Sequence, residues 1–271
     1  MVSYSTLIKV ITEYTTKNDH YTGMSAPLPN RMKGQINKFA EDLKTFSEED
    51  RKIEHGRIIT PEGRLIAEIR GSEDKIGIGL WSIPIEERRK VIDNNTSMHT
   101  VHTHPSGMDT GLPTILSKQD VLALCHAQVG FKTENGKLVE FKPLWTSTTA
   151  ISTNGSRMTL TITDLDKWTE KGRIRLKDRF TSNPLIRKYK KLENSYYNFI
   201  NDCEDYANAQ MGLKLEDEIR KNPTTDPAIL KDNIKNRTKK EYSKKLMKDY
   251  LAEDIEGFKE LGLDLSIGWY E

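Results

Sequence analysis

Residues 51–165 alternate short apolar runs with polar turns, a pattern that predicts several short β-strands in this part of the chain. Apolar runs at 58–59 and 65–69 flank a Pro-Glu-Gly turn, which is typical of a β-hairpin. Asn135-Gly136 and Asn154-Gly155 each lie between β-rich runs, and Asn-Gly is a strong signal for a tight hairpin turn. We therefore expect at least three hairpins here.

Helix-like segments interrupt these strands. Pro84 predicts the start of a helix that runs through Ile92, because proline is favoured in a first helical turn. A second helix is predicted over about 117–129, ended by a glycine. Residues 99–104 are predicted as a strand between the two helices, and 76–80 as a further candidate strand. The zone is thus of mixed α and β class, with helices inserted between strands.

The flanks of this zone differ from it in composition, which divides the 271 residues into three parts. Residues 1–50 are predicted to be a mainly helical segment, and 166–271 a charged, mostly helical C-terminal region. Within the first part, 31–46 has apolar residues at helical spacing, namely Met32, Ile36, Phe39, Leu43 and Phe46.

Length and composition exclude some classes of protein. The longest apolar runs, such as 121–125, are far shorter than the about 18–20 residues that a membrane span needs. The N-terminal residues show no basic segment followed by an apolar stretch, so no signal peptide is predicted. Cys125 and Cys203 alone make no disulfide framework and fit a reducing compartment, so we expect a cytoplasmic protein without membrane partners.

The net charge of the chain is only +2, but the charged residues are unevenly distributed along it. Residues 171–191 include nine basic residues and one acidic residue, Asp178. Residues 231–248 include eight basic and two acidic residues. Cations and aromatics alternate at 188–199, a combination that can bind a nucleic-acid backbone and stack on bases. A solvated helix face with ordinary core aromatics explains the same pattern, and this second interpretation is favoured.

The segment that indicates chemistry is His102-Thr103-His104-Pro105. Side chains two residues apart on a strand point to the same face, so both imidazoles can reach one point. Asp120, in the first turn of the following predicted helix, can supply a carboxylate as a third ligand. Three protein ligands and one open position are the pattern of a catalytic zinc site, where the metal acidifies water and polarises a carbonyl.

These residues resemble the signature of the JAB/MPN (JAMM) zinc metalloproteases, in which a glutamate precedes His-Ser/Thr-His-Pro and a later Ser-x-x-Asp. The resemblance covers about residues 50–165 and implies a mixed β-sheet flanked by helices. It implies that His102, His104 and Asp120 bind Zn²⁺ and that Ser117 stabilises the oxyanion. Eleven residues, 106–116, lie between the proline and the serine, where the family usually has about six, and a looped-out insertion costs little closure entropy.

The resemblance also implies a glutamate as general acid and base, ahead of the first hairpin strand. Glu54 has that position and is preferred. Glu68, its rival, falls on the opposite face of a strand whose apolar side is Leu65, Ala67 and Ile69. The remaining candidates are predicted to lie in a turn or on a helix, namely Glu73, Glu86 and Glu87.

Several of these residues also have plain structural interpretations. Ser117 and Asp120 have the spacing of a helix capping box, which can coexist with metal binding because a capped helix start also fixes the carboxylate. His99, three residues before His102, should face the other way and is interpreted as structural.

The function expected from the resemblance is zinc-dependent hydrolysis of a peptide or isopeptide bond in a protein substrate. In relatives, the bond often joins a ubiquitin-like modifier to a lysine. Two alternatives stay open: a JAB-domain protein with a nucleic-acid-associated role through its basic C-terminal region, and a non-catalytic MPN scaffold.

Overall fold

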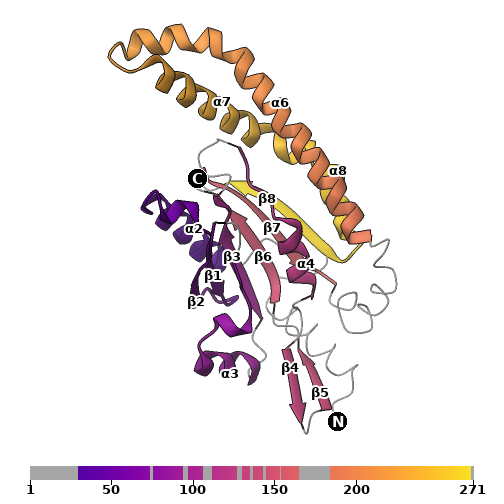
Figure 1. The fold of residues 1–271 in the computed structure, drawn as a ribbon. Coiled ribbons are helices and arrows are strands. Elements are labelled where there is room, and N and C mark those ends of the chain that lie inside the picture. Colours follow the sequence, from indigo (N-terminus) through magenta and orange to yellow (C-terminus); the bar gives the residue numbers. More distant parts are fainter. Residues whose placement is uncertain are drawn as a thin grey trace.

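The computed structural model describes residues 30–269 with several gaps (Figure 1). The gaps are 74–75, 94–96, 106–111, 127–129, 135–136, 143–144, 153 and 165–183. The first 29 residues of the predicted N-terminal segment, and most of the basic run at 171–191, therefore lie outside the described residues.

The architecture is a mixed sheet of six strands, flanked by helices. The strand order is β2-β1-β3-β6-β7-β8, and every neighbouring pair is antiparallel except β3 and β6. The strands are β1 (His55–Ile59), β2 (Leu65–Arg70), β3 (Met98–Thr103), β6 (Trp145–Ile151), β7 (Ser156–Ile162) and β8 (Leu263–Trp269). A separate hairpin pairs β4 (Gly130–Glu134) with β5 (Lys137–Lys142).

The helices vary widely in length. They are α2 (Asn30–Lys44), α3 (Ile85–Asp93), α4 (Lys118–His126), α6 (Pro184–Lys221), α7 (Pro227–Tyr250) and α8 (Ala252–Lys259), with 3₁₀ turns at Asp50–Lys52 and Leu80–Ser82. Among the residues that the structure describes, none of these helices has an apolar stretch that could cross a bilayer.

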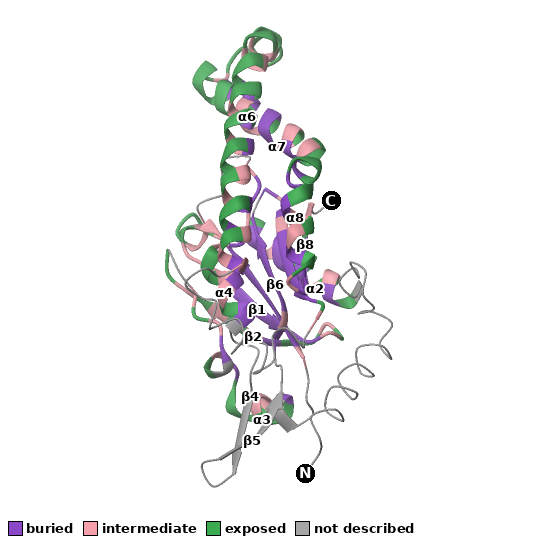
Figure 2. Ribbon diagram, turned by 90° about the vertical axis from the view of Figure 1, so that its right-hand side faces the viewer, coloured by how far each residue is buried: buried purple, intermediate pink, exposed green. Residues whose placement is uncertain are grey.

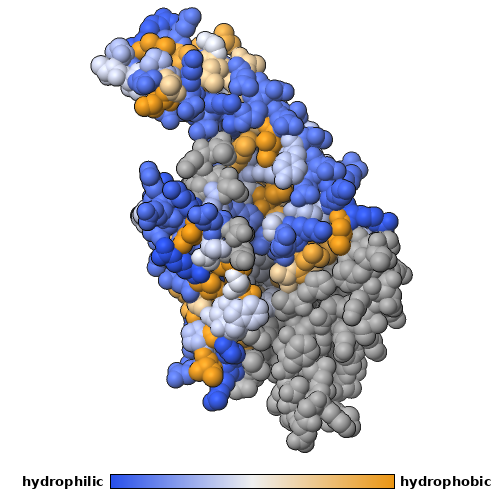
Figure 3. Space-filling model, in the orientation of Figure 1, coloured by the Kyte–Doolittle hydropathy of each residue, from blue (hydrophilic) through white to orange (hydrophobic). Residues whose placement is uncertain are grey.

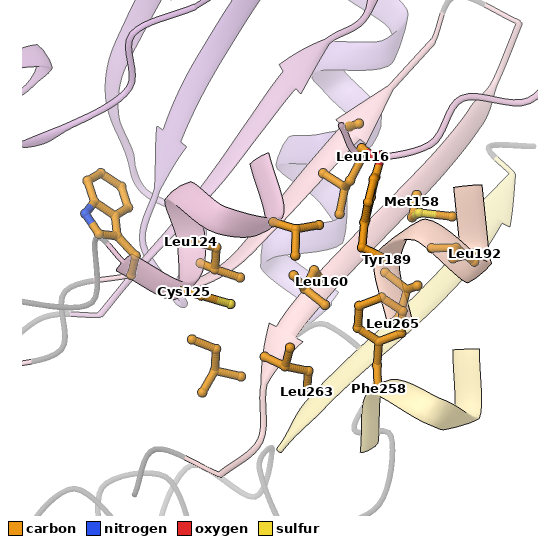
Figure 4. Close-up of a cluster of buried hydrophobic side chains, with 14 of the residues drawn as sticks. Leu116, Leu124, Cys125, Met158, Leu160, Tyr189, Leu192, Phe258, Leu263 and Leu265 are labelled. Atoms are coloured by element: carbon orange, nitrogen blue, oxygen red, sulfur yellow. The ribbon is translucent and has the colours of Figure 1, made fainter. Parts of the chain in front are cut away.

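The two faces of the sheet bury different cores. On one face, α2 packs its apolar stripe against Ile59, Val101 and Ile151. On the other face, a larger cluster joins Met98, Met158 and Leu160 of the strands to α4, α6, α7 and α8 (Figure 4). Alternation along each strand divides the side chains between the two cores. Strand β3 is buried throughout, and β6 and β7 are buried at all but one position each (Figure 2).

Helices α6 and α7 form a long antiparallel hairpin that projects beyond the sheet (Figure 1). Helix α6 has 38 residues and is therefore about 57 Å long. All of its buried residues lie in the first two thirds of the helix, before residue 208. Apolar side chains are exposed toward the tip of the hairpin, among them Leu213, Ile219 and Ile229, and the surface there is otherwise largely hydrophilic (Figure 3).

Most of the predicted elements are confirmed. Helix α2 covers the predicted 31–46 segment except its last two residues. Four of the residues named from the spacing are buried in it, together with Ala40, and Phe46 packs alongside just after the helix. The β1–β2 and β6–β7 hairpins form as expected, and Gly155 has φ +92° in the second turn, where a Cβ would be strained. The prediction of β-strand structure on either side of Asn135-Gly136 is also confirmed.

Two predictions about strands need correction. Residues 76–80 do not form a strand: the side chains of Ile76 and Ile78 instead pack closely over Gly56, where an added Cβ would be only 2.7 Å from Ile76 Cδ1. Strand β8 was not predicted, because its residues fall in the charged C-terminal region. It pairs with β7, so the region after residue 165 contributes the last strand of the sheet.

Candidate metal centre

Three side chains from two elements meet at the carboxyl end of β3. Nε2 of His102 lies 3.1 Å from Nε2 of His104, and each of these nitrogens lies 3.2 Å from an oxygen of Asp120. All three side chains are largely shielded from solvent, with His102 the most buried. Among the described residues this is a group that could hold a metal ion.

The geometry of this group fits a divalent metal with tetrahedral coordination. Zinc binds histidine nitrogen and carboxylate oxygen at about 2.0–2.2 Å, which places tetrahedral ligand atoms about 3.3 Å apart. The two nitrogens are 3.1 Å apart, and each lies 3.2 Å from a different oxygen of Asp120, Oδ1 for His102 and Oδ2 for His104, so these separations are close to that value. Three ligand atoms leave one tetrahedral position open, as catalytic zinc sites do.

The local structure explains why these residues converge. His102 is opposite Gly56 of β1 and Ala150 of β6, on the sheet face that α4 covers. The parallel pairing of β3 with β6 requires a crossover connection, and α4 forms part of it. The start of α4 is thereby brought to the carboxyl end of β3, so Asp120 meets the two histidines.

The predicted capping box is present at the start of α4. The Ser117 N–H donates to Oδ2 of Asp120 at 2.7 Å, and the Asp120 N–H donates to Oγ of Ser117 at 3.2 Å. The side chain of Asp120 therefore takes part in the helix cap and also faces the two histidines as a candidate metal ligand. Because Ser117 Oγ accepts in the cap, its own proton can still be donated elsewhere.

Charge and burial oppose one another at the site. Burial disfavours the ionised Asp120, but the attraction of His102 and hydrogen bonds from both histidines outweigh it and hold the pKa of this carboxyl well below its usual value. Burial likewise disfavours a charged His102, but Asp120, with a further contribution from Glu54, raises the pKa of His102 above 6.5. Without metal, the site therefore favours an ion pair that keeps the imidazole protonated.

Glu54 lies next to this group. Its backbone extends the β1–β2 ladder, where its N–H donates to Ser72 O at 2.8 Å. Since Gly56 is opposite His102, alternation puts Glu54 on the same sheet face as both histidines. The charge of Glu54 acts on His102, and its side chain is half-buried. The position predicted for Glu54 thus adjoins the candidate metal centre.

Glu68 and His99 lie where their sequence positions suggested. Glu68 forms an ion pair with Arg57, which also pairs with Asp42 of α2, so it belongs to the opposite sheet face. His99 is fully buried on that face, bonded to Ser147 and Thr149. Burial and the nearby His102 lower the pKa of His99 to about 3, which leaves it neutral.

Thr114 is a site residue that the sequence analysis did not identify. Its Oγ1 lies 3.3 Å from Nδ1 of His104, so it can accept a hydrogen bond from that nitrogen when Nε2 binds metal. Its own N–H donates to Ser156 Oγ at 2.8 Å, which ties it to β7. Thr114 belongs to the segment between Pro105 and Ser117, and no motif marked it. By contrast, Nδ1 of His102 is buried without a hydrogen-bond partner among the described residues.

The basic and aromatic run around residue 190 is engaged within the fold. Tyr189 and Phe199 are buried in the main core. Lys188 pairs with Glu260, and Lys191 pairs with Glu253 and with the buried Asp254. These contacts agree with the interpretation of core aromatics on a charged helix, while a nucleic-acid-associated role for the C-terminal region stays a prediction.

Comparison with known proteins identifies no relative of this chain. We found no match among protein-family models, among curated proteins or among solved structures.

Proposed function

We propose that the protein is a zinc-dependent hydrolase of amide bonds, with the JAB/MPN type of site and fold. The observation that carries this proposal is the convergence of His102 Nε2, His104 Nε2 and Asp120 at mutual distances of 3.1–3.2 Å, beside Glu54. A structural zinc site would use four protein ligands, whereas this group offers three. The carboxylate of Glu54 lies nearby and is not needed as a ligand.

Each residue has a distinct chemical task in this proposal. His102, His104 and Asp120 would hold Zn²⁺, which supplies a Lewis acid that acidifies water and polarises a carbonyl. Glu54 accepts the proton of the attacking water and returns it to the leaving amine, a task that suits a half-buried carboxylate at the rim of the site. The Ser117 hydroxyl donates a hydrogen bond to the developing oxyanion.

The substrate follows from the resemblance of the motif. We propose a peptide or isopeptide bond in a protein, with a ubiquitin-like modifier as one partner. Because only Glu54 among the proposed catalytic groups moves a proton, hydrolysis requires one carboxylate to act first as base and then as acid.

The test combines metal analysis with cleavage assays on the full chain. We expect about one zinc per chain after purification without chelators, a rise in Tm when zinc is returned to stripped protein, and cleavage of ubiquitin-like fusions or lysine-linked conjugates. Protein that contains no zinc and gains no stability from added zinc would contradict the proposal. Zinc binding without cleavage of any amide substrate would support the metal site and contradict the hydrolase.

A further inference from the structure

Two tyrosines of α6 hold the segment that leads into the candidate metal centre. Tyr196 donates a hydrogen bond from its hydroxyl to the carbonyl of Pro113 at 2.6 Å, and Tyr189 donates one to the carbonyl of Leu116 at 3.0 Å. The two tyrosines are seven residues apart, so they lie on one face of the helix, two turns or about 10 Å from each other. Tyr189 lies beside Leu116 in the main core (Figure 4).

Each of these carbonyls belongs to a peptide group whose N–H is also hydrogen-bonded to a side chain. The Leu116 carbonyl shares its peptide with the N–H of Ser117, which donates to Oδ2 of Asp120 at 2.7 Å. The Pro113 carbonyl shares its peptide with the N–H of Thr114, which donates to Oγ of Ser156 at 2.8 Å. The two bonds of this peptide fix the backbone of Thr114, whose hydroxyl lies 3.3 Å from Nδ1 of His104. Since a peptide group is planar and rigid, holding its oxygen also orients its N–H.

The structure assigns to Tyr189 and Tyr196 a role as positioning residues: through the two peptide groups, they set the orientation of Asp120 and His104. This inference rests on the proposed function, because it is the metal centre that these residues orient. It also gives a task to the described part of the long segment 106–116, which carries both bonded carbonyls.

The bond of Tyr189 is buried, and the bond of Tyr196 is partly buried. Tyr189 is 3% exposed and Leu116 is fully buried, so water does not easily replace the tyrosine hydroxyl as the donor. A phenylalanine in place of Tyr189 would leave the Leu116 carbonyl without this donor and free the Ser117 peptide to tilt. The same change at Tyr196 acts on the Thr114 peptide. Loss of each hydroxyl is therefore predicted to affect a different peptide group, that of Ser117 for Tyr189 and that of Thr114 for Tyr196.

A merely structural role predicts a different result. If the hydroxyls only stabilise the packing of α6 on the sheet, their loss lowers overall stability without singling out Thr114 or Ser117. Tyr197 gives a matched control, because it is an exposed tyrosine of the same helix whose ring lies beside that of Tyr196.

The experiment compares Tyr189→Phe, Tyr196→Phe and Tyr197→Phe in the full chain, with and without zinc. In zinc-free protein, we expect the amide hydrogen exchange of Ser117 to rise about tenfold in Tyr189→Phe, and that of Thr114 to rise about tenfold in Tyr196→Phe. In zinc-loaded protein, we expect zinc affinity to fall about tenfold in both variants and the absorption spectrum of a cobalt-substituted site to shift. Tyr197→Phe should match the wild type in every measurement.

Two results would overturn the inference. One is exchange at Ser117 and Thr114 that is unchanged in both variants. The other is exchange that rises evenly across the sheet core, as a merely structural role predicts. A wild-type protein that binds no zinc would contradict the proposed function instead, and the exchange in zinc-free protein would still decide whether the tyrosines orient these peptides.

Discussion

The backbone N–H of Ser117 donates to Oδ2 of Asp120 at 2.7 Å, so the cap of α4 also holds the third candidate metal ligand. The same carboxylate oxygen lies 3.2 Å from Nε2 of His104. One local structure thus serves two purposes: it begins the helix, and it directs a carboxylate toward two imidazoles.

Asp120→Asn tests the ligand role directly. The amide keeps the shape of the side chain but removes its charge, so we expect zinc affinity to fall by more than the about 10–100-fold that loss of an outer hydrogen-bond partner costs. Chelator competition measures this. Asp226 caps α7 by accepting the N–H of Ala228, so Asp226→Asn is a matched control that should keep wild-type zinc affinity. Equal zinc affinity in the two variants would contradict the ligand role.

Glu54→Gln separates binding from chemistry. Because Glu54 is proposed to move a proton and not to bind the metal, we expect turnover to fall by about 100-fold or more while zinc content stays unchanged. Glu68→Gln should retain turnover, since Glu68 pairs with Arg57 on the opposite face. Glu68 is the exposed partner of this ion pair, and Arg57 keeps Asp42 as a second partner, so the substitution should cost only about 1 kcal/mol of stability. Full activity of Glu54→Gln would require another general base.

Ser117→Ala removes both a cap and a hydroxyl donor. We expect the free energy of unfolding to fall by about 1 kcal/mol and turnover to fall by roughly 100-fold. Ser117→Thr retains a hydroxyl and should restore most of both. Asp226→Ala also removes a cap, in α7, so it should lower stability by a similar amount without changing turnover. If Ser117→Ala kept wild-type turnover with reduced stability, the serine would be a cap alone.

Thr114→Val removes the hydroxyl beside Nδ1 of His104 and keeps the shape of the side chain. Outer partners of a ligating histidine fix the ring and its tautomer, so we expect zinc affinity to fall about tenfold. Thr238 offers a matched control, because it is a buried threonine whose hydroxyl accepts a bond from Lys214 in the α6–α7 hairpin. Thr238→Val should leave zinc affinity unchanged, even where it lowers Tm.

Zinc binding should weaken as the pH falls. The folded-state pKa of His102 lies above 6.5, so its pairing stabilises the zinc-free protein at low pH, and that stabilisation is lost as the pH rises through this pKa. Asp120 has a pKa well below 3.8 and stays ionised over the same range. Zinc must displace the His102 proton, so affinity should fall about tenfold per pH unit below that pKa. Titrations from about pH 5 to pH 8 measure this, and a flat profile would contradict the assignment.

Several features of the fold and of the site follow from patterns of residues that are close in the chain. Alternation on β3 placed His102 and His104 on one face, and the Ser-x-x-Asp spacing predicted the cap that the structure contains. The apolar spacing of α2 and the turn at Gly155 followed from the same kind of rule, because each depends on residues close in the chain.

Other features depend on residues distant in the chain, and no local pattern carried them. Strand β8 forms because β7 offers it an edge, although it lies about a hundred residues further on and follows charged helices. Ile76 and Ile78 have strand-like composition, yet they pack over Gly56 and do not extend the sheet. The hydrogen bonds of Tyr189 and Tyr196 exist only because α6 packs against the segment that precedes α4. Thr114 is held in the site by Ser156 of β7, which is 42 residues away in the chain. Hydrogen-bond partners of this kind are selected by how the elements pack, a property that short stretches of sequence do not encode.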